Sequence, residues 1–307
     1  MTRSWEGIYP STICPMDADG AIDEGGIERH AASLMAVAGI VGILCNGHAG
    51  ENFLLSPDEQ RRVTAATRTA MGSTGLLIAG INSESSTEAA VLARSAEAEG
   101  ADAVLVFPPF SWAVGQDDEI ALRHHAAILD AAGLPMMLFQ GSVRAGSTAY
   151  SPDVLAKLVE LPGVVGIKEG SWETAAYEAN RRLVKAVRPD IAVMASGDEH
   201  LLTCYAIGSE GSQVSLAVVI PEAIVELDAA MRASDLPRAR AAHQVVYPLA
   251  KAIYGTAPAG HATARLKTCL RLLGRLDDDT VRAPLSPVRG AELDMLKAAL
   301  RQAGFPV

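Results

Sequence analysis

The chain has 307 residues, of which 49% are hydrophobic and 20% are charged. These values describe a folded globular protein of one large domain or two ordinary ones, and they exclude an intrinsically disordered chain. The net charge of −10 argues against an extended basic surface that would bind nucleic acid or an anionic membrane.

The amino-terminal residues 1–16 contain no apolar run of the signal-peptide type. The longest apolar run, residues 34–45, is shorter than the roughly 20 residues that a bilayer-spanning helix needs. The four cysteines are far apart and form no CxxC pair. We therefore expect a cytoplasmic enzyme or binding protein, with reduced core thiols and no zinc site.

Short apolar segments recur along the first two thirds of the chain at intervals of roughly 20 to 34 residues, which is the length of a βα unit. Alanine-rich segments with helical periodicity lie between them. The apolar segments begin near residues 7, 39, 75, 101, 134, 163, 191 and 211. This rhythm predicts eight strands alternating with helices.

Two of the intervening segments carry clear helix signals. Ser56 is expected to be an N-cap, with Pro57 as the first helical residue and Glu59 as the capping-box acid. In residues 86–101 the apolar positions share one helical face, and Gly100 is expected to end the helix.

Apolar strands that alternate with helices indicate a parallel sheet covered on both faces. Eight such units predict a closed (β/α)8 TIM barrel over residues 1–218. An open, doubly wound sheet is the alternative, and it is disfavoured because no GxGxxG follows the first strand. After residue 219 the strand signals stop, which predicts a three-helix C-terminal extension, residues 219–307, packed on the barrel.

Active sites of such barrels lie at the carboxyl ends of the strands. Lys168 is at this end of the sixth segment, after the apolar residues 164–167. Its side chain either reaches out to water or stays partly desolvated. A desolvated lysine has a lowered pKa and can act as an amine nucleophile.

Other candidate residues follow other strands. Gly47 and Gly50, after the second strand, form either an ordinary turn or one whose N–H groups bind a carboxylate. Arg144, after the fifth strand, is either a bidentate carboxylate clamp or a surface ion-pair partner. Asp198 and Glu199, after the seventh strand, either accept hydrogen bonds from substrate hydroxyls or cap a helix.

Two motifs, GHAGE at 47–51 and GIKE at 166–169, resemble those of the dihydrodipicolinate synthase and N-acetylneuraminate lyase superfamily of class I Schiff-base aldolases. An arginine–glycine turn after the fifth strand and SGDE at 196–199 add to the resemblance, which covers the whole chain. It implies that Lys168 forms an imine with the keto group of pyruvate or another 2-oxo acid. It also implies that the turn containing Ala49 holds the substrate carboxylate, and that neither a metal nor an organic cofactor is required.

The chain departs from this family where hydroxyl groups are usual. Phe139 stands where most members have a tyrosine that shuttles protons, and His48 and Ala49 replace hydroxyl residues in the glycine turn. The loop after the fourth strand, residues 108–112, lacks the tyrosine pair of the synthases. His48 either replaces the lost proton relay or packs within the turn.

These features predict a Schiff-base lyase of the aldolase or dehydratase type. One alternative is a true 4-hydroxy-tetrahydrodipicolinate synthase, and the other is a non-catalytic relative that binds 2-oxo acids. Arg144 keeps an acidic second substrate possible, whereas Asp198 and Glu199 resemble the pair that holds sugar-acid hydroxyls. The apolar loop at 107–115, with Phe110 and Trp112, predicts a homo-oligomer, a tetramer built as a dimer of dimers.

Overall fold

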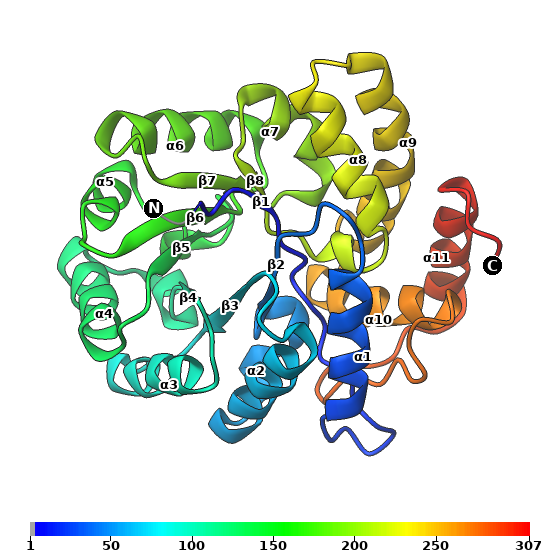
Figure 1. Cartoon of the computed structure of the whole chain (residues 1–307), viewed down its shortest axis with the longest axis horizontal. Helices are drawn as coiled ribbons and strands as arrows, with labels where there is room; N and C mark the ends of the chain where they lie inside the picture. Colours follow the sequence, from blue (N-terminus) through cyan, green and yellow to red (C-terminus); the bar gives the residue numbers. More distant parts are fainter. Residues whose placement is uncertain (1–3) are drawn as a thin grey trace.

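The computed structural model describes residues 4–307, which form a parallel barrel of eight strands with helices around it (Figure 1). Adjacent strands pair in the order β1-β8-β7-β6-β5-β4-β3-β2. Parallel bridges from Ile8 to Ile40 and from Ser11 to Leu44 join the two ends of this order, so the barrel is closed. The strands are β1 (Gly7–Ile8), β2 (Gly42–Cys45), β3 (Leu76–Ile81), β4 (Ala103–Val106), β5 (Met136–Gln140), β6 (Val164–Glu169), β7 (Ala192–Ala195) and β8 (Gly211–Ser212). The predicted (β/α)8 barrel is confirmed.

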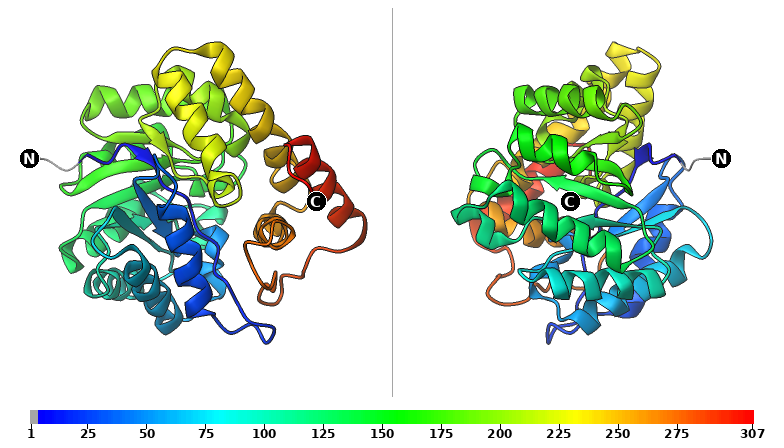
Figure 2. Two further views of the ribbon diagram at one scale, coloured as in Figure 1. Left: turned by 45° about the vertical axis from the view of Figure 1, so that its right-hand side comes forward. Right: turned by 90° about the vertical axis from the view of Figure 1, so that its left-hand side faces the viewer.

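One helix follows each strand on the outside of the barrel. These helices are α1 (Glu24–Met35), α2 (Pro57–Met71), α3 (Ser86–Ala98), α4 (Asp118–Ala131), α5 (Pro152–Val159), α6 (Thr174–Val187), α7 (Leu201–Ile207) and α8 (Pro221–Arg232). The C-terminal extension is made of α9 (Leu236–Ile253), α10 (Ala262–Leu272) and α11 (Gly290–Gln302). Figure 2 shows α10 and α11 gathered at one side of the barrel.

α8 directly follows β8, in the position of the eighth helix of a (β/α)8 repeat. The segment from 221 onward divides at Ala233, and Ser234 takes a left-handed backbone conformation with φ of 57°. The helices α9 to α11 follow. The division of the chain into a barrel and an extension at residue 218 stays a prediction.

Local hydrogen bonds start α2, and the side chains of the strands divide between two hydrophobic clusters. The Ser56 Oγ accepts a hydrogen bond from the Glu59 N–H, and the Glu59 carboxylate accepts one from the Ser56 N–H, so the predicted capping box of α2 is confirmed. Inward-facing side chains such as Leu44, Ile78 and Met137 fill the barrel interior. Side chains that face outward from the strands pack against the helices in a second, larger cluster.

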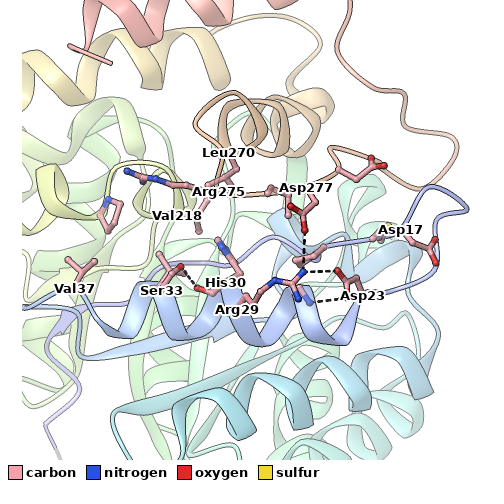
Figure 3. Close-up of a pocket in the computed structure, with 18 of the residues that line it drawn as sticks. Asp17, Asp23, Arg29, His30, Ser33, Val37, Val218, Leu270, Arg275 and Asp277 are labelled. Carbon is pink, nitrogen blue, oxygen red and sulfur yellow. Dashed lines mark hydrogen bonds and ion pairs between the residues drawn. The ribbon is translucent and has the colours of Figure 1, made fainter. Parts of the chain in front are cut away.

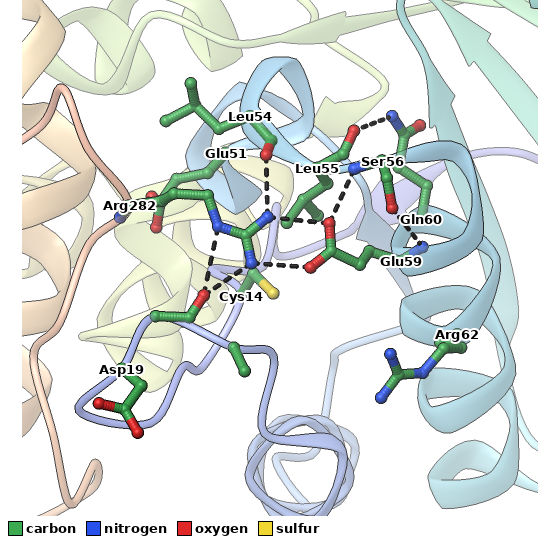
Figure 4. Close-up of polar contacts among 12 residues, drawn as sticks. Cys14, Asp19, Glu51, Leu54, Leu55, Ser56, Glu59, Gln60, Arg62 and Arg282 are labelled. Carbon is green, nitrogen blue, oxygen red and sulfur yellow. Dashed lines mark hydrogen bonds and ion pairs between the residues drawn. The ribbon is translucent and has the colours of Figure 1, made fainter.

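The extension is tied to the loop after β2 by buried charges (Figure 4). The Lys267 ammonium on α10 lies 2.5 Å from Glu51 Oε1, and both side chains are fully buried. The N–H of Arg282 donates to Glu51 Oε2 at 2.9 Å. The Arg282 guanidinium pairs with Glu59 and also donates to the Gly20 and Leu54 carbonyl oxygens. The extension therefore fixes the position of this loop.

All four cysteines are buried free thiols, as predicted from their spacing. Burial raises the pKa of the Cys45 thiol to about 12, so it stays protonated and inert at neutral pH. Across residues 4–307, the helices are all too short or too polar to cross a bilayer. The cytoplasmic location stays a prediction.

Candidate active site

Lys168 is the reactive group around which the site is built. It lies in β6, paired in register with Phe139 of β5, and its side chain is only 8% exposed. Its Nζ donates to Ser11 Oγ at 3.0 Å. Burial lowers the pKa of the ammonium to about 8, and the nearby Asp198 carboxyl opposes this shift. A lysine with this pKa supplies neutral amine close to physiological pH.

Glu169, the next residue in β6, has a structural role. Its Oε1 accepts a hydrogen bond from Asn180 Nδ2 at 2.8 Å, and its Oε2 accepts from the Ser171 hydroxyl at 3.0 Å. Burial raises the pKa of this carboxyl, and the hydrogen bonds oppose the shift. The acid beside the lysine therefore secures the β6–α6 connection and does not line the cavity.

A cavity of about 470 Å³ opens over Lys168 at the carboxyl ends of the strands. This volume is typical of small-molecule sites. Its lining includes Ser11, Lys168, Ser196 and Asp198 from the barrel. The segment from α9 to α10 supplies Tyr254 and other residues, so the extension contributes to the cavity.

The glycine turn after β2 is a short 3-10 helix, His48–Gly50. The N–H of Gly50 donates to the Gly47 carbonyl oxygen at 2.9 Å, so this donor is used inside the turn. Asn46 and Glu51, which flank the turn, have φ of 51° and 58°. Non-glycine residues in this region store strain, and such strain is concentrated at functional sites.

His48 lies within an aromatic cluster. Its ring stacks on Phe107 with ring centroids 4.2 Å apart, and it also contacts the rings of Phe110 and Phe139. Burial lowers the pKa of His48 to about 3, and the charge of Lys168 adds to the effect. The imidazole is therefore neutral at pH 7 and a weak base. This differs from the expected pKa near 6.5, because the ring is desolvated.

Asp198 is a buried carboxyl in the cavity lining. Its Oδ1 accepts a hydrogen bond from the Leu216 N–H at 2.9 Å. Burial raises the pKa of the carboxyl to about 7, against the opposing charge of Lys168. The Tyr254 hydroxyl donates to Ser215 Oγ at 2.8 Å, and burial and the Asp198 charge raise its pKa. Asp198 thus combines proximity to Lys168 with a pKa suited to proton transfer.

The structure brings together most of the predicted site residues. Lys168, His48, Ala49, Phe139 and Asp198 line the cavity. Gly47 and Gly50 belong to the same turn as Ala49 but are not part of the cavity lining.

Two predicted residues lie elsewhere. Arg144 is exposed and is not part of the cavity lining, because the loop after β5 carries it out toward solvent. Glu199 also lies outside the lining, and its carboxylate is 3.8 Å from the Lys251 ammonium on α9. In this structure neither residue is placed to bind a substrate in the cavity.

Several lining residues were missed from the sequence. Phe53 and Phe107 line the cavity and follow the ends of strands. Because only 5% of the residues are aromatic, two phenylalanines at strand ends were a signal that could have identified them. Trp172, just after β6, has φ of 59°, which sequence does not reveal. Tyr254 enters from α9, and its role depends on how the extension packs.

A second cavity, of about 600 Å³, lies away from the barrel mouth between α1 and the segment after α10 (Figure 3). Its lining mixes acidic and basic residues, several of which already have partners. Arg29 is 3.4 Å from both Asp23 and Asp277, and Arg275 donates to the Val219 carbonyl oxygen. Lys168 does not line this cavity, so we place the chemistry at the barrel mouth.

A (β/α)8 barrel with a buried lysine in a cavity at the carboxyl ends of the strands is typical of enzymes that use an amine nucleophile. The sequence model of the Dihydrodipicolinate synthetase family matches residues 4–303. The chain belongs to this family, and it is a lyase.

Individual relatives agree with the membership. The 4-hydroxy-tetrahydrodipicolinate synthase of Methanothrix thermoacetophila is 30% identical, with 92% of each chain covered. The 4-hydroxy-tetrahydrodipicolinate synthase 1 of Streptomyces coelicolor is 33% identical over 89% of this chain and 86% of its own. The solved structure of the chloride-inhibited dihydrodipicolinate synthase from Acinetobacter baumannii, complexed with pyruvate, has a TM-score of 0.87 and 26% identity, covering 99% of this chain and 100% of its own.

Proposed function

We propose that the chain is a Schiff-base lyase in which Lys168 attacks the keto carbon of pyruvate or another 2-oxo acid. The observation that carries this proposal is the buried amine with a pKa of about 8 at the base of the cavity at the strand ends. At pH 7 about one amine in ten is then neutral and nucleophilic. The resulting protonated imine withdraws electrons from the adjacent carbon, so a C–C or C–O bond one atom further on can break.

The substrate carboxylate needs donors beside the imine. Because Gly50 N–H is used inside the turn, we assign this role to the N–H groups of His48 and Ala49, at the start of the short 3-10 helix.

We assign proton transfer to Asp198, in place of the tyrosine that most family members have at the position of Phe139. A carboxyl with a pKa of about 7 exchanges protons readily at neutral pH. The Leu216 N–H donates to Asp198 Oδ1 and so fixes the position of this oxygen. The Tyr254 hydroxyl, which donates to Ser215 Oγ, also lies near the Asp198 carboxyl. His48 is the second candidate, and its low pKa disfavours it.

Borohydride trapping tests the proposal directly. The chain is incubated with a panel of 2-oxo acids, reduced, digested and mapped by mass spectrometry. The expected adduct is on Lys168, and Lys168→Arg abolishes it, because a guanidinium stays protonated and is not a nucleophile. An adduct on another lysine, or none with every 2-oxo acid tried, overturns the proposal.

A true 4-hydroxy-tetrahydrodipicolinate synthase is the second candidate, since the curated relatives at 30% and 33% identity carry that name. Phe139 and the exposed Arg144 weigh against it, because the hydroxyl relay and the clamp for an acidic aldehyde are both absent from the cavity. Condensation of pyruvate with an amino-aldehyde acid at a rate exceeding that for other aldehydes would establish this candidate instead.

A relative that binds 2-oxo acids without turnover is the third candidate, favoured only by the lost hydroxyl at Phe139. A binder forms no reducible adduct, or forms one without exchanging the methyl protons of pyruvate. Proton exchange in deuterated water, followed by NMR, separates the two cases. Exchange that depends on Lys168 identifies an enzyme.

We also propose a homo-oligomer, a dimer of dimers, assembled through the loop after β4. Of the two aromatic residues expected in this interface, only Phe110 is exposed. Trp112 is buried against His124, whereas Phe110 and Val114 are exposed. A mass near 32 kDa by light scattering at micromolar concentration would contradict the proposal.

A further inference from the structure

One wall of the Lys168 cavity is aromatic. Four of the five phenylalanines of the chain line it: Phe53, Phe107, Phe110 and Phe139. They surround the His48 ring with centroid distances between 4.2 and 6.1 Å. In a chain with 5% aromatic residues, this concentration is a property of the site and not of the composition.

The rest of the lining, here called the polar wall, holds little charge. Ser196, Asp198, Ser215 and Tyr254 belong to it, and the Trp172 ring packs beside Tyr254. Among the described residues that line the cavity, the basic side chains are Lys168 and His48. Lys168 is used to form the imine, and His48 is neutral at pH 7. A second carboxylate on the substrate would therefore be desolvated without a cationic partner, which is costly. A polyhydroxylated chain would place its hydroxyls against phenyl rings on the first wall.

We propose that the carbonyl partner of the 2-oxo acid at this site is an aryl aldehyde. The inference rests on the proposed imine chemistry at Lys168. The aryl ring stacks against Phe53 and Phe110 at the open side of the wall, and aromatic pairs prefer such offset or edge-to-face contacts. The oxygen of the former aldehyde then faces the polar wall and Asp198.

The reaction balances without an added oxidant or reductant. A 4-aryl-4-hydroxy-2-oxobutanoate forms an imine between its C2 and Lys168, releasing water. The Asp198 carboxylate takes the C4 hydroxyl proton, the C3–C4 bond breaks, and its electron pair moves into the enamine. The aryl aldehyde leaves, C3 is protonated, and water hydrolyses the imine to pyruvate and free Lys168. Condensation is the reverse sequence.

The test compares three aldehydes as partners of pyruvate at equal concentration: benzaldehyde, succinic semialdehyde and glyceraldehyde. Benzaldehyde is expected to have a kcat/KM at least about tenfold above either of the others. Phe53→Ser is expected to raise the KM for benzaldehyde by about 3- to 10-fold, with pyruvate still trapped at Lys168. This side chain is 44% exposed, so the substitution removes little core packing.

Tyr247→Ser is the matched control, because this aromatic side chain is 48% exposed on α9 and lies outside the cavity. It should leave the KM unchanged. If pyruvate is trapped at Lys168 but the carboxylated or the polyhydroxylated aldehyde is preferred, the aryl assignment is overturned and the imine mechanism stands. If pyruvate is not trapped at Lys168, the proposed function fails and this assignment fails with it.

Discussion

Replacing Lys168 with methionine should stabilise the folded chain at neutral pH while abolishing imine formation. Folding lowers the pKa of this amine from 10.5 to about 8, chiefly through burial. At about 1.4 kcal/mol per pKa unit, holding the charged amine in the folded state at pH 7 costs about 3 kcal/mol. The lost hydrogen bond to Ser11 offsets about 1 kcal/mol, which leaves a net gain of about 2 kcal/mol.

The pH dependence gives the test its sign. Because folding lowers the pKa, the unfolded state binds more protons between pH 8 and 10.5, and the stability of the parent chain rises with pH across this window. The advantage of the methionine variant should therefore be full below about pH 8 and mostly gone by about pH 9.5. The methionine side chain itself does not titrate.

Urea unfolding followed by tryptophan fluorescence measures the difference at pH 7 and at pH 9.5. Lys251→Met is the control, since its ammonium is about half exposed and it does not line the cavity. A Lys168→Met variant that is less stable than the parent at pH 7, or equally more stable at both pH values, would refute the reasoning.

Three other substitutions test separate parts of the site. Asp198→Asn should lower turnover by about 10²- to 10⁴-fold, with imine trapping at Lys168 intact. It should also lower the pKa of Lys168 further, because the carboxylate that raises this pKa is gone. Unchanged turnover would mean that another group transfers the proton. His48→Ala should leave the shape of the kcat–pH profile between pH 5 and 8 unchanged, since this ring has a pKa of about 3; the loss of a limb near pH 6.5 would restore His48 as the base. Glu51→Gln should destabilise the fold by about 3–5 kcal/mol in urea unfolding, because it leaves the buried Lys267 ammonium without a counter-charge. A loss below about 1 kcal/mol would show that its remaining hydrogen bond to the Thr280 carbonyl oxygen is enough to hold the charge.

The parts of the fold predicted from sequence are those set by local pattern. Continuous apolar runs located all eight strands, because a strand buried on both faces requires them. Ser56 and Glu59 located the start of α2 through hydrogen bonds within four residues of chain. Lys168 was placed correctly because strand ends of a parallel barrel share one edge.

The remaining features depend on how loops and the extension pack. Arg144 follows a strand as a clamp would, yet its loop turns it to solvent. Trp112 is in an apolar loop but packs inward against His124. The pKa of His48 is lowered by burial among rings from the segments after β2 and β4 and from β5, and Tyr254 reaches the cavity from the end of α9. None of these contacts is encoded by spacing along the chain.

The buried link between Glu51 and the extension has a consequence for the order in which the protein folds. The N–H of Arg282 that contacts Glu51 is 231 positions further along the chain, and the α10 lysine is nearly as distant. Contacts of such long sequence separation form late, because a large loop must close before they add stability. During synthesis the turn that we assign to carboxylate binding therefore emerges early but cannot take its final shape until almost the whole chain is available. Catalytic competence arrives at the end of folding, after the barrel strands have paired.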